Sequence, residues 1–144
     1  MKRFSFRLES IRDLREQIEE QAQLGLAEAL AAEAEAAERV ISAQERLAAA
    51  RTNLGAGVTG DELSGAVFYA ERCERELVAA TRAHSLECEG VTFARRALHE
   101  ASTRRQVLER LKERDRTTHA ADAMKAEEHH LGEVALAMFR RKVA

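Results

Sequence analysis

Proline is absent from this 144-residue chain, tryptophan is absent as well, and aromatic residues make up only 4% of it. Proline accounts for about 5% of residues in globular proteins and interrupts helices, so its absence favours long, unbroken helices. Because bulky apolar side chains are scarce, a compact layered core is not expected. Alanine and leucine suffice for a seam between two helices. We therefore predict an all-α coiled coil instead of a doubly wound sheet, a β-sandwich or a disulfide scaffold.

Cysteine is nearly absent too, with Cys73 and Cys88 as the only two. On one continuous helix they would lie about 22 Å apart, too far for an intrachain disulfide. No apolar run approaches the roughly 20 residues that span a membrane, and the basic N-terminus leads into no apolar segment typical of a signal peptide. The net charge is -2 with acids and bases interleaved, so we expect no nucleic-acid partner.

Glycine clusters at one place, and this cluster predicts the turn. Gly55, Gly57 and Gly60 lie close together, and Thr59 followed by Glu62 has the spacing of a capping box that opens a helix. We predict a helix over about 3–53, a turn over about 54–60 and a helix over about 60–141, which form a single antiparallel coiled-coil hairpin. Isolated glycines inside the helices would be tolerated where a close helix contact compensates for their cost: Gly25, Gly65, Gly90 and Gly132.

The apolar residues recur with coiled-coil spacing in both predicted helices. In the first helix, one series recurs every seven residues near the start, and a second series follows it: Phe4, Ile11 and Ile18, flanked by Leu8 and Leu14, then Leu26, Val40, Leu47 and Leu54. The two series differ in register by one residue, which predicts a nearly straight seam instead of a strict left-handed supercoil. The second helix predicts a seam through Leu63, Ala66, Ala70, Cys73, Leu77, Ala80, His84, Val91, Ala94, Leu98, Ala101 and Leu108.

The end of the second helix is predicted to extend beyond its partner. A hairpin turning near residue 57 would place Phe4 opposite the neighbourhood of residue 113, leaving about 45 Å of helix beyond it. Residues 112–130 are almost entirely polar and show no seam, and a short apolar face follows them: Leu131, Val134, Ala135, Met138 and Phe139. Since such a face has nothing in its own chain to pack against, we expect it to bind another molecule.

No motif for catalysis or cofactor binding is present. The phosphate-binding, dinucleotide-binding, zinc-protease and nucleophile-elbow patterns are all missing, so we expect no enzymatic activity, no catalytic residue, no cofactor and no small-molecule substrate. His84 and Cys88, with Glu87 beside them, offer at best three metal ligands, and we interpret them as a seam histidine near a buried thiol. The cluster Glu127–His130 does not converge on a helix, so no metal site is predicted there either.

Two phenylalanines near the N-terminus, Phe4 and Phe6, have two possible roles. They could cap the seam, or they could anchor the chain in a partner's pocket, where aromatic side chains contribute strongly to affinity. The basic residues around them lie where a helix dipole disfavours cations, which slightly favours a partner: Lys2, Arg3 and Arg7.

The opening residues, Phe4–Glu16, read FSFRLESIRDLRE. They resemble the start of the flagellar export protein FliJ family, whose members open with an F-x-F-x-L pattern before an alanine- and glutamate-rich helix. Asn53 and Leu54 before the glycine-rich turn, the segment from Leu77 through Ala80 to His84, and a glutamate-containing tail that ends in Phe139 and an arginine are similar too. Gly132 departs from the family, which usually has aspartate there.

This resemblance implies an antiparallel coiled coil similar to the gamma-subunit stalk of rotary ATPases. It also implies three partners: the hexameric flagellar export ATPase, the export gate membrane protein and the export chaperones. The implied location is cytoplasmic and peripheral to the inner membrane at the flagellar base. We expect the ATPase to contact Phe4, Leu8, Leu131, Val134, Met138 and Phe139, and we expect Glu133 to contact a partner as well. We expect the gate or the chaperones to contact Leu77, Ala80 and His84.

Two other interpretations of the pattern remain. The chain could be a generic structural or tethering coiled coil that forms a homo-oligomeric bundle, since Leu63–Leu108 is long enough to pair with a second copy. It could also be a metal-dependent regulator that uses His84 and Cys88. Light scattering separates the first alternative from a monomeric stalk, and the zinc content of the purified protein tests the second.

Overall fold

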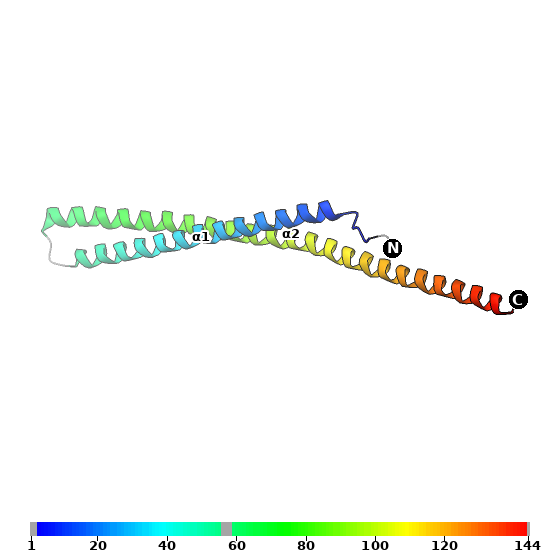
Figure 1. Cartoon of the computed structure of the whole chain (residues 1–144). Helices are drawn as coiled ribbons and strands as arrows, with labels where there is room; N and C mark the ends of the chain where they lie inside the picture. The colour runs from blue at the N-terminus through cyan, green and yellow to red at the C-terminus, as the bar shows by residue number, and fades with distance from the viewer. Residues whose placement is uncertain (1–2, 56–58, 144) are drawn as a thin grey trace. The chain divides into compact units, whose positions relative to one another are not determined.

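The computed structural model describes residues 3–55 and 59–143 and contains two helices, α1 (Glu9–Leu54) and α2 (Gly60–Val143), as Figure 1 shows. Within these residues there is no strand. The two helices pack against each other in antiparallel fashion and the second is longer, which confirms the predicted fold class. The centre of the predicted turn, including Gly57, lies outside the described residues. No helix in the described ranges carries a stretch apolar enough to cross a membrane.

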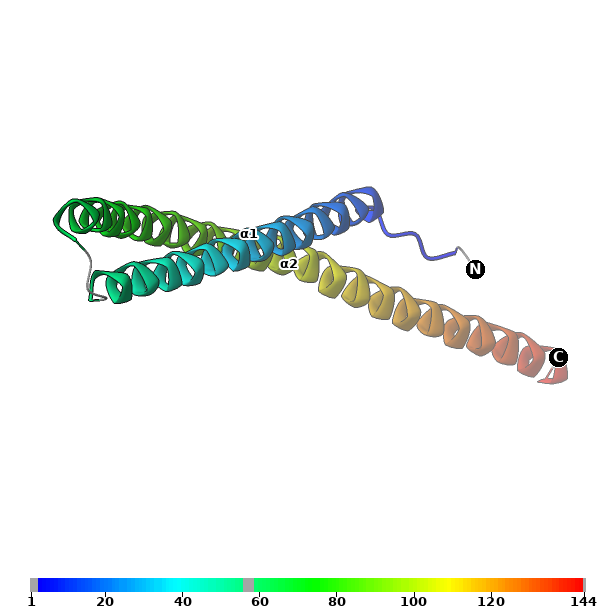
Figure 2. The ribbon, with the colours of Figure 1, turned by 90° about the vertical axis from the view of Figure 1, so that its left-hand side faces the viewer.

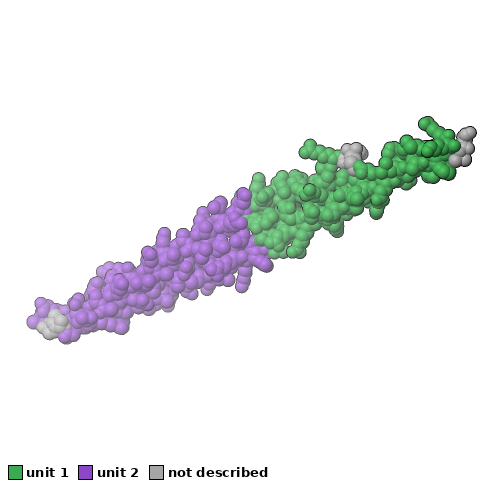
Figure 3. All heavy atoms as spheres, turned by 60° about the horizontal axis from the view of Figure 1, so that its bottom comes forward, with its two compact units in different colours: residues 1–19, 101–144 green, residues 20–100 purple. Residues whose placement is uncertain are grey.

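The helices contribute to two compact units, which Figure 3 colours separately. Unit 1 comprises residues 1–19 and 101–144, and unit 2 comprises residues 20–100. In unit 2, the segments of α1 and α2 that flank the turn lie side by side, as Figures 1 and 2 show. In unit 1, the start of α1 lies beside α2, and the last part of α2 continues past the N-terminal segment (Figure 2).

Helix α1 begins at Glu9, later than the predicted start near residue 3. Residues 3–6 are not helical, and the backbone N–H of Glu9 donates to the carbonyl oxygen of Phe6 at 3.2 Å. A helix N-terminus disfavours cations and favours carboxylates, so Arg3 and Arg7 are poor first-turn residues and Glu9 is a good one. The basic residues therefore remain outside the helix.

Helix α2 begins with the predicted capping box. The hydroxyl group of Thr59 donates to Oε2 of Glu62 at 2.6 Å, and the backbone N–H of Thr59 donates to the same oxygen at 3.1 Å. These two bonds, the one from the hydroxyl first, lower the pKa of Glu62. The backbone N–H of Leu63 also donates to the carbonyl oxygen of Thr59 at 2.8 Å, which closes the first turn.

The seam of unit 2 is built mainly from alanine and leucine at alternating spacings of three and four residues. In α1 the seam positions, all buried or half-buried, are Ala22, Leu26, Ala29, Glu33, Ala36, Val40, Ala43, Leu47, Ala50 and Leu54, and half-buried Ala32 and Ala37 flank them. In α2 they are Ala66, Ala70, Cys73, Leu77, Ala80, His84, Glu87, Val91, Ala94 and Leu98, flanked by half-buried Glu76, Ala83 and Cys88. The predicted α2 seam is thus confirmed across unit 2, except that Leu63 is 43% exposed. Small side chains allow the two backbones to approach closely, and one buried cluster contains Leu47, Ala50, Ala70 and Cys73.

The seam of unit 1 differs from the prediction because charged residues occupy it. Ile11 and Leu14 are 43% and 53% exposed, whereas Glu19 is buried at 8%. The seam positions are Leu8, just before α1, then Arg12, Arg15 and Glu19 in α1, and Ala101, Arg105, Leu108, Lys112 and Asp115 in α2; the predicted seam residue Ile18 is half-buried beside Glu19. The seam positions keep the spacing found in unit 2, so the predicted one-residue change of register is wrong, and the straight seam loses its basis in that change. The prediction that residues 112–130 show no seam is also wrong at Lys112 and Asp115.

No close packing contact accounts for the isolated glycines in the structure. A Cβ atom added at Gly25, Gly65, Gly90 or Gly132 would meet no neighbouring atom within 4 Å. The expected close helix contacts are therefore not found at these positions. Each glycine lowers helix propensity without a compensating contact in its own chain.

Candidate partner-binding surfaces

The last part of α2 presents an apolar stripe to solvent. Every side chain that the structure describes from residue 124 to residue 142 is exposed. Leu131 and Met138 are 67% and 66% exposed, and they share one helix face with Val134 and Ala135 at spacings of three and four residues. Phe139, 66% exposed, lies at the edge of this face, and Leu136, 60% exposed, lies on the opposite one. We call Leu131, Val134, Ala135 and Met138 the tail stripe.

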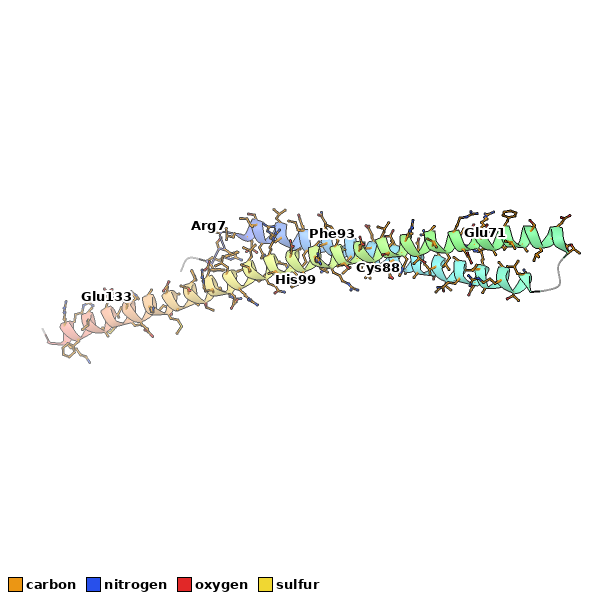
Figure 4. The ribbon with its side chains drawn as sticks, turned by 180° about the vertical axis from the view of Figure 1, so that it is seen from behind. Arg7, Glu71, Cys88, Phe93, His99 and Glu133 are labelled. Atoms are coloured by element: carbon orange, nitrogen blue, oxygen red, sulfur yellow. The ribbon has the colours of Figure 1, made fainter. Side chains whose placement is uncertain are left out.

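Residues N-terminal to the tail stripe continue an open surface. A shallow hollow along α2 is lined by His119, Ala123, Ala126, His130 and Leu131, together with Asp122 and Glu127. From His119 to the end of α2 the helix runs for about 36 Å at a rise of 1.5 Å per residue. Figure 4 labels Glu133 on this segment, which has no second helix beside it there. Exposed apolar side chains that gather on one face of a helix indicate a binding surface.

Charged residues lie opposite the tail stripe and at its end. Glu133 is exposed on the face of α2 opposite the stripe, with 3.7 Å between its Oε1 and Nδ1 of His129. Arg140, Arg141 and Lys142 occupy the last turn of α2, where cations interact favourably with the helix dipole. A partner that covers the stripe would therefore meet basic groups at the end of α2.

The N-terminal phenylalanines pack within unit 1, as expected for a seam cap. Phe6 is 7% exposed, and the ring of half-buried Phe4 meets the ring of His119 edge-on with 5.6 Å between centroids. The predicted neighbour of Phe4 was near residue 113. The difference arises because residues 3–6 are not helical and span more length per residue than the helix opposite. Phe4 and half-buried Leu8 are thus largely engaged in their own chain.

Ion pairs hold the two helices of unit 1 together. Arg105 pairs with buried Glu19, and this contact raises the pKa of Arg105. Nζ of Lys112 lies 2.8 Å from Oε1 of Glu9, and Nη1 of Arg12 lies 3.6 Å from Oε1 of Glu109. The hydrophobic pattern could not reveal these pairs, since charged residues carry no apolar signal.

In unit 2 the predicted contact residues Leu77, Ala80 and His84 all lie half-buried in the seam. Leu77 packs against the buried cluster around Leu47. More exposed apolar side chains lie nearby on an outer face of α2: Leu86 is 66% exposed and Phe93 is 75% exposed. Sequence reasoning missed this pair, although its spacing of seven residues was a detectable signal.

One polar cluster interrupts the seam of unit 2. Nε2 of His84 lies 2.9 Å from Oε1 of Glu33, and Sγ of Cys88 lies 3.6 Å from Nε2 of His84 and 4.0 Å from Oε1 of Glu33. Glu33 belongs to α1, and Figure 4 shows Cys88 where α2 runs beside α1. The sequence pointed to His84 and Cys88 with Glu87 as a possible third ligand; the third member is instead Glu33.

Comparison with known proteins gives one result. The family model described as the flagellar FliJ protein matches residues 4–144. No curated protein and no solved structure matches the chain. The match covers the tail stripe and the seams of both units.

Proposed function

This chain belongs to the flagellar FliJ family and is a component of the flagellar export apparatus, and we propose that it acts there as a non-enzymatic stalk that docks on the hexameric export ATPase. The exposed tail stripe carries this proposal. A component that only spaced other proteins would gain nothing from Leu131 and Met138 in solvent, whereas a docking element needs such a surface. The family model extends through these residues.

A pair of helices suits insertion into a ring. Each α-helix with its side chains is about 10 to 12 Å across, so two packed helices present a narrow element. Because α1 and α2 differ in length and in sequence, a ring of identical subunits around them meets different side chains at each subunit. Unequal contacts favour some conformational states of the ring over others, because only differential binding shifts a population. Such a bias among the states of the ring would regulate ring assembly and the order in which its subunits hydrolyse ATP.

Stimulation of the export ATPase tests the docking proposal. The variant Leu131→Ser with Met138→Ser polarises the tail stripe, and Leu136→Ser is the matched control because it removes an equally exposed leucine from the opposite face. We expect the double variant to lose most of the stimulation and the control to keep it. Equal stimulation by the double variant and the control would overturn the role of the tail stripe. Deletion of residues 131–144 gives the upper limit of the effect.

We propose a second contact surface, on unit 2, for the export gate membrane protein and the export chaperones. It consists of the exposed side chains of Leu86 and Phe93 on the outer face of α2, opposite the seam positions Leu77, Ala80 and His84 that the sequence pattern suggested for this contact. We propose that the chain makes these contacts in the cytoplasm, peripheral to the inner membrane at the flagellar base. Pull-down of purified gate and chaperones with Leu86→Ser and Phe93→Ser tests it. Undiminished capture would remove these two residues from the surface.

A homo-oligomeric bundle is the second candidate, because unit 1 also exposes apolar residues: Ile11, Leu14 and Val107. A second copy of the chain could cover them and form a bundle of packed helices. Light scattering at micromolar concentration separates the two candidates. The stalk predicts a monomer, and the bundle predicts a stable dimer or tetramer that Leu14→Ser with Val107→Ser dissociates.

A further inference from the structure

We propose that Glu33, His84 and Cys88 form a binding site for a zinc-class transition metal that joins α1 to α2 in unit 2. The three side chains bring one oxygen, one nitrogen and one sulfur atom within 4.8 Å of one another. Among the residues that the structure describes, no other His, Cys, Asp and Glu side chains form such a group. This inference is independent of the docking proposal.

The distances between the ligand atoms match a tetrahedral site. Zinc bonds of about 2.0 to 2.3 Å at tetrahedral angles place neighbouring ligand atoms about 3.3 to 3.8 Å apart. The three observed separations are 2.9, 3.6 and 4.0 Å, so small side-chain movements bring all three atoms into range. His84 and Cys88 are four residues apart on one face of α2, and Glu33 closes the site from α1.

The position of the cluster in the seam supports a ligand role. Glu33 and His84 stand where neighbouring seam positions hold alanine, such as Ala29, Ala36 and Ala80. An apolar pair would pack there without the cost of desolvating a carboxylate and an imidazole. The side chains of Glu33 and His84 are each 31% exposed, so an ion can enter from solvent and keep water as its fourth ligand.

The donor set selects the type of metal. A thiolate with an imidazole suits zinc and cobalt, whereas magnesium and calcium prefer sites made only of oxygen ligands. The bound ion would hold the two helices at one register. Because the site exists only when both helices are packed, binding would stabilise the folded hairpin by mass action.

Cobalt is the direct probe, because a Co²⁺–thiolate bond adds a charge-transfer absorption that carboxylates and imidazoles do not produce. We expect the reduced full-length protein to bind one Co²⁺ with this absorption, and zinc to displace it. Cys88→Ala should abolish the absorption. Cys73→Ala is the matched control, since Cys73 is the other thiol and lies buried in the seam away from Glu33. It should leave the absorption intact.

Zinc-dependent melting provides the second measurement. Zinc should raise the melting temperature of the wild type and of His129→Ala, which lacks the tail histidine paired with Glu133. It should not raise that of Glu33→Ala or Cys88→Ala, whose zinc affinity should fall by more than the roughly 10- to 100-fold that an outer-shell contact is worth. Helicity measured by circular dichroism shows that each variant is folded. The proposal is overturned if the wild type gives no thiolate absorption, or if Cys88→Ala retains it.

Discussion

The seams of units 1 and 2 have the same spacing of three and four residues, but different types of residue occupy the seam positions. In unit 2 the seam contains Ala36, Ala43 and Ala50 at 1 to 2% exposure, with Val40 and Leu47 between them. In unit 1 the corresponding positions hold Arg12, Arg15 and Glu19. A seam of methyl groups gains stability from burial, whereas a seam of ion pairs has to offset the desolvation of its charges. We infer that unit 2 supplies most of the stability, and that unit 1 opens more easily.

The largest expected effect lies in the seam of unit 2. Leu47→Ala removes a side chain that is 7% exposed, and it should lower the free energy of unfolding by about 2 to 3 kcal/mol. Leu24→Ala on the same helix is the control. Leu24 is 65% exposed, so its loss should change the free energy of unfolding by less than about 0.5 kcal/mol. Urea denaturation followed by circular dichroism measures both. Equal losses in the two variants would contradict the assigned seam.

The ion pairs of unit 1 give the next effect. Arg105→Ala leaves Glu19 buried without its main partner and should lower the free energy of unfolding, by less than the loss of a fully buried pair because Arg105 is partly exposed. Replacing both residues with leucine should restore at least the wild-type stability, since an apolar pair fits this spacing. Urea denaturation of the single and double variants checks this. If the double variant were no more stable than Arg105→Ala, the comparison between the seams would be wrong.

The unpacked glycines predict a gain in stability. Gly25→Ala and Gly90→Ala should each stabilise unit 2 by about 0.5 to 1 kcal/mol, because the added methyl group meets no neighbour and alanine favours the helix. Gly132→Ala should raise the helicity of the tail without moving the urea midpoint. A loss of stability in Gly90→Ala would show that the residue has a packing role.

The smallest effect concerns the capping box of α2. The hydrogen bonds from Thr59 lower the pKa of Glu62 in the folded chain, so their contribution to stability is present above the unfolded-state value of about 4.3. It is lost as the pH falls through the lower folded-state pKa. Carbon NMR titration of the Glu62 carboxyl group measures the shift, and Thr59→Ala should return the pKa toward its ordinary value. An unchanged pKa in that variant would exclude the hydrogen bonds as the cause.

Sequence reasoning predicted unit 2 better than unit 1, for a physical reason. Leu47 and Ala70 follow the hydrophobic pattern, and Thr59 with Glu62 has a recognisable spacing, so these features could be located from the sequence. Arg105 could not, because a seam position that is filled by an ion pair has no hydrophobic signal.

The polar cluster and the tail show the same contrast. Glu33 was missed as a partner of His84 because their contact depends on the register between two helices, which the sequence alone did not fix. The apolar face around Leu131 and Met138 was predicted correctly, since it depends only on spacing within one helix. Local patterns were therefore predictable, and contacts between charged residues on different helices were not.

Amide hydrogen exchange of the tail stripe tests the docking proposal most directly. The chain is measured alone and after addition of the hexameric export ATPase from the same organism. The exposed end of α2, over residues 131–142, should exchange rapidly in the free chain, because its hydrogen bonds lie in a helix without packing partners. We predict marked slowing over these residues in the complex. Unchanged exchange there, in a complex shown to have formed, would contradict the account.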